Sequence, residues 1–236
     1  MILPIHVYGS DVLRANSQEI DFATYEGLQE LIANMQETME RADGVGIAAP
    51  QVGLAIRLLI VDGAPFGEDD PELAAFRRVM INPVLLEESE ETAEYSEGCL
   101  SVPDIHADIT RPAKIKVKYL NEKGEEIVED FDGFKCRMVQ HEMDHLDGKM
   151  FVDRATPIRK KMISAKLCRD HLLADWSGTV HKHLAVQVIH LMLHHTAFET
   201  VKILNNLLTF LIKVFHLDFC RTCDICMNVG NTQATL

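Results

Sequence analysis

The chain has 236 residues, of which 47% are hydrophobic and 25% are charged, so it can bury the core of one well-packed domain and still carry an appendage. Its formal net charge of -13 opposes unspecific binding to nucleic acid or to an anionic membrane, because both surfaces are themselves negative. We therefore expect neither a specific nucleic-acid partner nor a membrane partner.

Residues 1–14 lack a basic segment followed by a long apolar run, so we expect no signal peptide and a cytoplasmic location. The six cysteines are unevenly spaced for a secreted disulfide framework. We interpret them as thiols or metal ligands.

The first predicted helix covers residues 25–42, where leucine, isoleucine and methionine recur at spacings of three and four. Two short segments rich in branched apolar residues follow, at 55–62 and 79–86, and these predict buried strands. The polar residues 63–72 between them contain Gly and Pro and predict a loop.

Residues 114–119 and 125–131 flank good turn residues and predict a β-hairpin. Helical spacing then returns over 134–146, with Gly148 as the expected C-terminal cap. Helices and strands do not alternate regularly, so the predicted fold class is α+β, with mixed, mainly antiparallel sheets around a central helix.

The composition changes near residue 165. Residues 1–165 hold 17 basic and 31 acidic side chains, whereas residues 166–236 hold 6 and 5, together with seven of the eleven histidines. A further helix is expected near Pro157. We predict one domain at 1–165 and a separate C-terminal extension at 166–236, helical or partly disordered, whose role the sequence does not indicate.

The predicted helix at 134–146 carries His141-Glu142-Met143-Asp144-His145. Residues four apart share one helix face, so both imidazoles can bind one zinc or ferrous ion while Glu142 stands beside it, ready to move protons. The alternative is a surface helix that carries two histidines and an acid by coincidence.

A catalytic metal site usually has three protein ligands, and the third is expected from the segment Glu97-Gly98-Cys99-Leu100-Ser101. A thiolate is a strong ligand for Zn(II) or Fe(II), and the neighbouring glycine lets the backbone approach the ion. Cys99 is therefore the predicted third ligand, although by itself it would be interpreted as a buried thiol.

Small residues fill the segment 44–51, Gly-Val-Gly-Ile-Ala-Ala-Pro-Gln, between the first predicted helix and the first strand. They leave room for an extended substrate backbone, and the Gln51 amide can donate to a developing oxyanion. A tightly packed turn is the alternative interpretation.

Together these segments resemble the three motifs of the peptide deformylase family: Gly-φ-Gly-φ-Ala-Ala-x-Gln, Glu-Gly-Cys-φ-Ser and Gln-His-Glu-x-Asp-His, where φ is apolar. Residues 44–51, 97–101 and 140–145 match them in this order without a departure. The resemblance covers about residues 1–167 and leaves the extension unexplained.

The resemblance implies that Cys99, His141 and His145 hold the metal, with Fe(II) as the usual ion and Zn(II) or Ni(II) as substitutes. Glu97 is expected to be a buried acid that supports the ligands and pairs with Arg111.

Glu142 would take the proton from the water that attacks the formyl carbon and would deliver it to the departing amine. The Gln51 amide and the Leu100 backbone N–H would stabilise the oxyanion, and Gly46 would pair with the substrate backbone.

Val45 and Met138 are expected to line an apolar pocket for methionine, unless they are simply core residues. The implied substrates are nascent chains that begin with N-formylmethionine, met near the ribosome, and the products are formate and a free amino terminus.

The extension carries a second possible metal group, because Cys220, Cys223 and Cys226 have cluster-like spacing and His190 and His194 are four residues apart. It lacks a nearby fourth cysteine and an adjacent glutamate. A frame-shifted or fused segment also explains its composition.

Two rival functions remain open. The first is a zinc endopeptidase that uses the same histidines and Glu142, which needs a third ligand downstream and gives Cys99 and Gln51 no role. The second is a catalytically silent binding protein on the deformylase scaffold, with the extension as its working part; the intact Glu142 and Gln51 argue against it.

The substitution Cys99→Ala separates the deformylase hypothesis from the endopeptidase. Loss of one of three ligands should abolish stoichiometric metal binding, measured by elemental analysis after gel filtration. Metal retained by the variant at the level of the unsubstituted protein would favour the endopeptidase.

Overall fold

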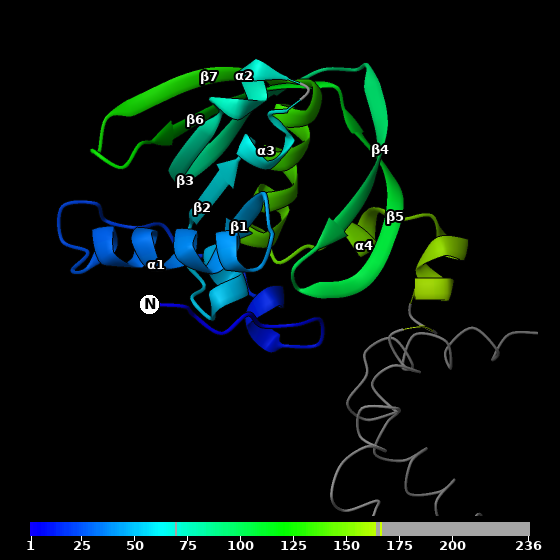
Figure 1. The fold of residues 1–236 in the computed structure, drawn as a ribbon, viewed down its shortest axis with the longest axis horizontal. Helices are drawn as coiled ribbons and strands as arrows, with labels where there is room; N and C mark the ends of the chain where they lie inside the picture. The colour runs from blue at the N-terminus through cyan, green and yellow to red at the C-terminus, as the bar shows by residue number, and fades with distance from the viewer. Residues whose placement is uncertain (69, 164–165, 167–236) are drawn as a thin grey trace, which may run out of the picture. The chain divides into compact units, whose positions relative to one another are not determined.

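The computed structural model describes residues 1–68, 70–163 and 166, and a five-stranded antiparallel sheet lies at the centre of this part (Figure 1). The strand order is β1-β2-β3-β6-β7. The bounds are β1 Gly46–Ala48, β2 Leu58–Asp62, β3 Arg77–Glu88, β6 Lys114–Leu120 and β7 Glu126–Asp132.

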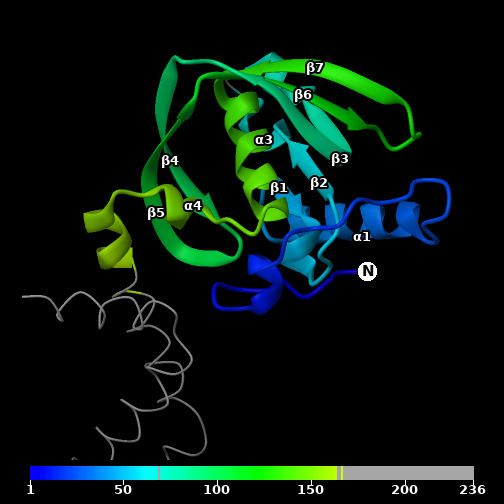
Figure 2. The same ribbon diagram turned by 180° about the vertical axis from the view of Figure 1, so that it is seen from behind.

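Two long helices lie against this sheet, α1 (Leu28–Arg41) and α3 (Gly133–Leu146). On the far side of α3 from the sheet, β4 (Thr92–Cys99) and β5 (Val102–Pro112) form a separate two-stranded hairpin, and both ribbon views show α3 between the two (Figures 1 and 2). The short elements are the 3-10 helices η1 Asp11–Arg14, η2 Ala49–Val52 and η3 Ala64–Phe66, and the helices α2 Pro71–Ala74 and α4 Phe151–Arg154.

Strand β2 shows why the sheet needs a helix on each face. Leu58 and Ile60 join the cluster around α1, whereas Leu59 and Val61 join the cluster around α3. All four side chains are fully buried, because successive side chains of a strand point to opposite faces and both faces of this strand are covered. One face of the sheet therefore holds α3 in place.

The predicted α+β class is confirmed, and the predicted helices, strands and hairpin are present with shifted ends. The loop predicted at 63–72 contains η3 and α2, because Pro at the first turn of each starts a short helix. Residues 46–48, expected in a connection, form β1; three residues are too few for a recognisable alternation.

Among the described residues, no helix is long and apolar enough to cross a membrane. The predicted extension at 166–236 and its possible metal group lie outside the described residues, Lys166 excepted. A helical stretch does begin at Pro157.

Helix α3 ends immediately after the second histidine of its motif, at a glycine cap. Gly148 has a φ of +67°, its N–H donates to the His145 carbonyl at 3.2 Å, and the Lys149 N–H donates to the Asp144 carbonyl at 2.8 Å. These two hydrogen bonds satisfy two of the last carbonyls of the helix, and they form the C-terminal cap expected at this glycine.

Gly148→Ala should lower the free energy of unfolding by about 3 kcal/mol, because a left-handed φ costs about 1–2 kcal/mol without glycine and a contact penalty adds to it. The new Cβ would lie 2.6 Å from the Arg14 carbonyl oxygen. Urea unfolding of the metal-free protein measures the loss.

Gly133→Ala is the matched control, since Gly133 also has a positive φ, of +52°, but its Cβ would meet no atom within 4 Å. It should cost only about 1 kcal/mol. Equal losses in the two variants would contradict the contact with Arg14.

Candidate active site

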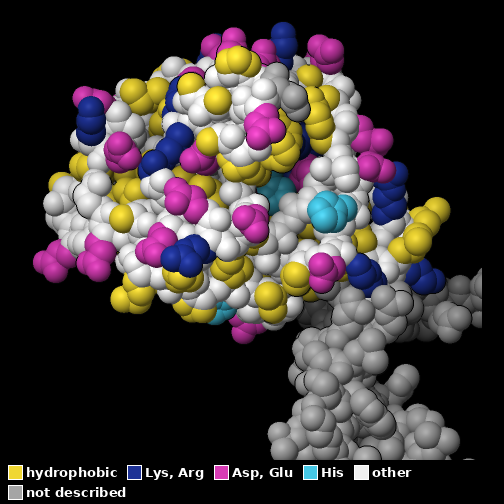
Figure 3. All heavy atoms as spheres, viewed as in Figure 1, with side chains coloured by type: hydrophobic (Ala, Val, Ile, Leu, Met, Phe, Trp, Pro, Cys, Tyr) yellow, Lys and Arg dark blue, Asp and Glu magenta, His cyan; other side chains and the backbone are white. Residues whose placement is uncertain are grey.

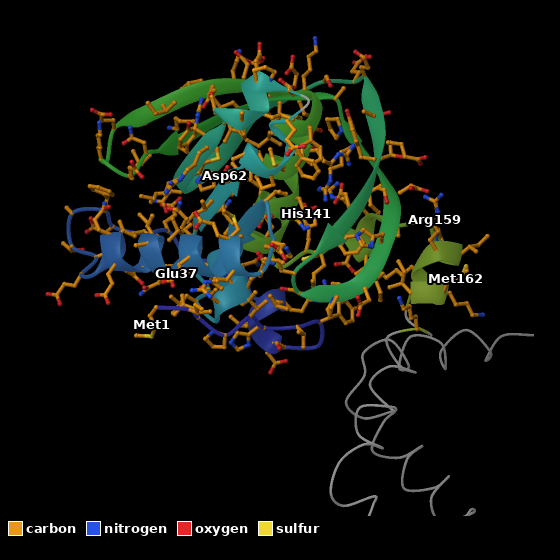
Figure 4. The ribbon with its side chains drawn as sticks, viewed as in Figure 1. Met1, Glu37, Asp62, His141, Arg159 and Met162 are labelled. Atoms are coloured by element: carbon orange, nitrogen blue, oxygen red, sulfur yellow. The ribbon has the colours of Figure 1, made fainter. Side chains whose placement is uncertain are left out.

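The polar face of α3 is buried in the protein interior rather than exposed to solvent. His141 and His145 lie one turn apart, with ring centroids 5.2 Å from each other, and Glu142 lies between them; all three are at most 9% exposed. His141 projects from α3 near the centre of the unit formed by residues 1–160 (Figure 4). Burying polar groups costs free energy unless they have partners. We therefore infer that these side chains have a structural or a chemical role.

Cys99 reaches this face from the end of β4. The pairing of β4 with β5 shifts register between Glu97 and Cys99, and the two-residue turn Leu100–Ser101 follows. The Cys99 Sγ lies 3.3 Å from the His145 Nε2, and one ligand atom each from Cys99, His141 and His145 fall within 4.8 Å of one another.

This group fits one metal ion. Thiolate and imidazole ligands around a tetrahedral Zn(II) or a similar ion are about 3.6 Å apart, close to the observed separation of Sγ and Nε2. Within the described part of the chain, the Glu142 Oε2 beside this group is buried without a hydrogen-bond partner. Buried orphan atoms of this kind mark a place that water, an ion or substrate completes.

The electrostatics of the metal-free cluster favour a charged pair, a thiolate on Cys99 beside an imidazolium on His141. Burial alone would raise the pKa of the Cys99 thiol, but the charges and hydrogen bonds of His145 and His141 outweigh it and lower the pKa to about 5. Burial would lower the pKa of His141, yet its contacts with Cys99 and Glu97 raise it to about 10. These shifts favour the thiolate, which is the form that binds metal, whereas His141 must release a proton before it can bind an ion.

Glu142 is placed to exchange protons near neutral pH. Burial raises the pKa of its carboxyl to about 7, although His141 and His145 act in the opposite direction. The carboxylate lies directly over the Cα of Gly46, where a Cβ would come within 2.2 Å of the Glu142 Oε1. Gly46 therefore leaves the space that Glu142 occupies.

The amide of Gln51 has a fixed orientation. Its Oε1 accepts from the Ala48 N–H at 2.8 Å, so its Nε2 points to the opposite side, 3.2 Å from the Ser101 Oγ and 3.6 Å from the Cys99 Sγ. The side chain is 1% exposed. A donor held this rigidly beside the metal ligands suits an oxyanion, because it needs no reorganisation during the reaction.

Behind the site, Glu97 pairs with Arg111. The guanidinium donates to both carboxylate oxygens at 2.7 and 2.8 Å, and the Glu97 Oε2 contacts the His141 Nδ1 at 2.8 Å. Burial would raise the pKa of Glu97, but the hydrogen bonds from Arg111 and His141 lower it far below its usual range. A carboxylate on the outer nitrogen of a histidine fixes the ring for metal binding.

A pocket of about 510 Å³ opens from these residues to solvent. Figure 3 shows a hollow near the centre of one face, where a histidine is visible between hydrophobic and acidic side chains. Val45, Gly46 and Met138, the predicted substrate-binding residues, line it, and so do Leu100 and Gln51. Met138 is also packed in the core around α3.

Some pocket residues were missed by sequence reasoning. Phe134 and Ile105 add apolar surface, and His106 lies at the rim against Gly98. Phe134 stands four residues before Met138, so the helical period could have identified it. Ile105 and His106 lie on β5 and carry no such signal.

A buried Cys/His/His group that can hold one ion, beside a buried carboxylate and at the base of an open pocket, is the arrangement of a mononuclear metallohydrolase. The sequence profile of the polypeptide deformylase family matches residues 2–161. The chain therefore belongs to this family, as its three motifs predicted.

Individual relatives agree with the family match. The peptide deformylase of Christiangramia forsetii is 42% identical over 174 residues, which cover 71% of this chain and 88% of the relative. The crystal structure of the Thermus thermophilus enzyme is similar with a TM-score of 0.64 at 36% identity, covering 74% of this chain and 97% of that one. A class I type b peptide deformylase from Acinetobacter baumannii, bound to Met-Ala-Ser, gives a TM-score of 0.61 at 41% identity, covering 66% and 99%.

Gly46→Ala should reduce kcat by roughly 100-fold or more, the scale expected when a proton-transfer group is displaced. The added Cβ overlaps the Glu142 Oε1, and β1 has little room to move because its three residues are buried and pair with β2. Stopped assays of formate release measure the loss. Metal content should stay at the unsubstituted level, and a variant with unchanged kcat would show that Glu142 does not need this space.

Proposed function

We propose that this chain removes the formyl group from the N-terminal formylmethionine of newly made polypeptides and releases formate. The observation that carries the proposal is the joining of Cys99, His141 and His145 into one ligand group with Glu142 beside it at the base of the pocket. Family membership and the names of the relatives support the same activity.

The proposed reaction uses three groups of the chain. Glu142 accepts the proton of the attacking water and passes it to the amine that leaves, which suits a carboxyl whose pKa is near 7. The Gln51 Nε2 and the Leu100 backbone N–H donate to the oxygen of the formyl group as negative charge develops on it.

The proposed metal ligands are Cys99, His141 and His145, and Fe(II) is the proposed native ion, with Zn(II) or Ni(II) as substitutes. The ion would supply Lewis-acid chemistry and lower the pKa of water. A site with thiolate and imidazole donors accepts each of these ions, so the ligands alone do not choose between them.

The proposed substrate begins with a residue that has a formylated amino group and an apolar side chain. Val45 and Met138, with Phe134 and Ile105, give the pocket the apolar walls that a methionine side chain needs. Gly46, on the short strand β1, offers backbone for pairing with an extended peptide. The Acinetobacter baumannii relative holds the tripeptide Met-Ala-Ser.

Such substrates are nascent chains, so we place the activity in the cytoplasm and near the ribosome. The proposed catalytic unit is residues 1–165, because each proposed ligand and reactive group lies between Val45 and His145. Residues 166–236 are proposed to be a separate extension, and the sequence does not indicate its role.

The endopeptidase alternative needs a further ligand downstream of the histidine motif. Asp147 pairs with Arg57 and Asp153 with Arg14, so both carboxylates have other partners. The ligand group found within the described ranges instead includes Cys99. The silent binding protein has no supporting observation, since Glu142 and Gln51 are both in place.

Protein purified without oxygen and loaded with Fe(II) should release formate from formyl-Met-Ala. The control is Glu142→Gln, which keeps the size of the side chain and removes the proton acceptor, and should lower kcat by about 10²- to 10⁴-fold with iron still bound. A metal-loaded protein that releases no formate would refute the proposal.

Comparison with a chain that ends at Lys166 tests the role of the extension. Equal kcat values are expected. Activity only in the shorter chain would make the extension an inhibitory segment.

A further inference from the structure

A line of charged side chains runs from the metal-ligand group to the surface. From the inside outward its members alternate in charge, Glu97, Arg111, Asp144 and Arg154. The first three are at most 5% exposed by side chain, and Arg154, the last residue of α4, is 39% exposed.

Each contact in the line is a charge-assisted hydrogen bond. Arg154 binds Asp144 through two bonds of 2.6 Å, one to each carboxylate oxygen. The Arg111 Nη1 donates to the same Asp144 at 2.5 Å, while its Nε and Nη2 hold Glu97. Paired, planar contacts of this type fix orientation as well as charge.

Arg111 pairs with two carboxylates, Glu97 and Asp144. Because of this shared partner, Arg154 can affect the contacts of Glu97. With Arg154 present, Asp144 has two guanidinium partners. Without it, the buried Asp144 would depend on Arg111, and the Arg111 contact with Glu97 would weaken in a site of low dielectric. Arg137 would still hold the Glu97 Oε1, but the Oε2 accepts its guanidinium bond from Arg111. Glu97 is the group that holds the His141 Nδ1.

The same short helix touches His141 directly. Phe151, the first residue of α4, is 1% exposed and stacks on the His141 ring, with centroids 6.0 Å apart and planes inclined by 24°. The two ends of α4 therefore restrain His141 in two ways, by the ring contact of Phe151 and through the charged line from Arg154.

We propose that Arg154 is a positioning residue for the metal centre, which acts through Asp144, Arg111 and Glu97 to hold His141 in the orientation that binds the ion. It contacts neither the proposed ligand atoms nor the pocket. Its effect should therefore appear in metal retention more than in substrate binding.

The test compares Arg154→Gln with the unsubstituted full chain, each loaded with Zn(II). Transfer of zinc to an excess of a chromogenic chelator should be about fivefold faster in the variant, less than the roughly 10- to 100-fold caused by losing a direct partner of a ligand. The visible absorption of the Co(II)-loaded proteins should also differ, because it reports the geometry of the ligands.

Arg159→Gln is the matched control. Arg159 is 40% exposed by side chain, pairs with Asp108 outside the line, and lies beyond α4 (Figure 4). Its variant should release zinc at the unsubstituted rate. Equal zinc release from the Arg154→Gln variant and the unsubstituted protein, or equal acceleration in both variants, would overturn the proposal.

Arg154→Lys separates positioning from general stability, because lysine keeps the charge but cannot make the paired contact. Its zinc release should fall between those of the unsubstituted protein and Arg154→Gln. If Arg154→Gln does not fold, Arg154→Lys decides: faster release than Arg159→Gln supports the proposal, and release at the unsubstituted rate overturns it.

The inference rests on the proposed ligand set, and its failure can be told apart from a failure of the proposed function. An unsubstituted chain that binds no zinc would refute the ligand set. A chain that binds zinc but releases no formate would leave the role of Arg154 intact and refute the activity.

Discussion

The paired contact between Glu97 and Arg111 is the interaction on which the rest of the site depends. Both side chains are at most 5% exposed, and an ion pair so deeply buried recovers the cost of its desolvation only when geometry is good and the remaining donors and acceptors are used. Here they are used: Arg137 also donates to Glu97, and the second Glu97 oxygen holds His141. The ligand helix, the hairpin and the buried charges are thus fixed together, and the polar face of α3 can exist inside the protein.

The residues of the ligand group were predictable from sequence because their signals are local. His141 and His145 are joined by helical spacing, and Cys99 lies in a short motif of its own. Gly148 marks the end of α3 by a backbone conformation that glycine favours. The predicted ligands meet in one group, although they lie up to 46 residues apart.

The parts that could not be predicted depend on contacts between distant segments. Strand β1 is defined by its pairing with β2, and the β4–β5 hairpin by a register that no short pattern reveals. The family resemblance predicted the pair of Glu97 with Arg111, and the structure shows it. The continuation of the line through Asp144 to Arg154 was not predicted, because in the sequence these two side chains resemble ordinary surface charges. Pocket residues such as His106 were not predicted for the same reason, since only the folded hairpin brings them to the rim of the pocket.

The Glu142 carboxylate fills the space that a side chain at position 46 would need. This limits which residues can stand at positions 46 and 142. A larger residue at position 46 would fit only with a shorter acid at 142, and aspartate would withdraw the carboxylate from the ligand group by one methylene. The two positions are therefore expected to change together or not at all, although they lie in different elements and almost a hundred residues apart. Covariation between a strand glycine and a helix acid would be the evolutionary trace of a steric constraint.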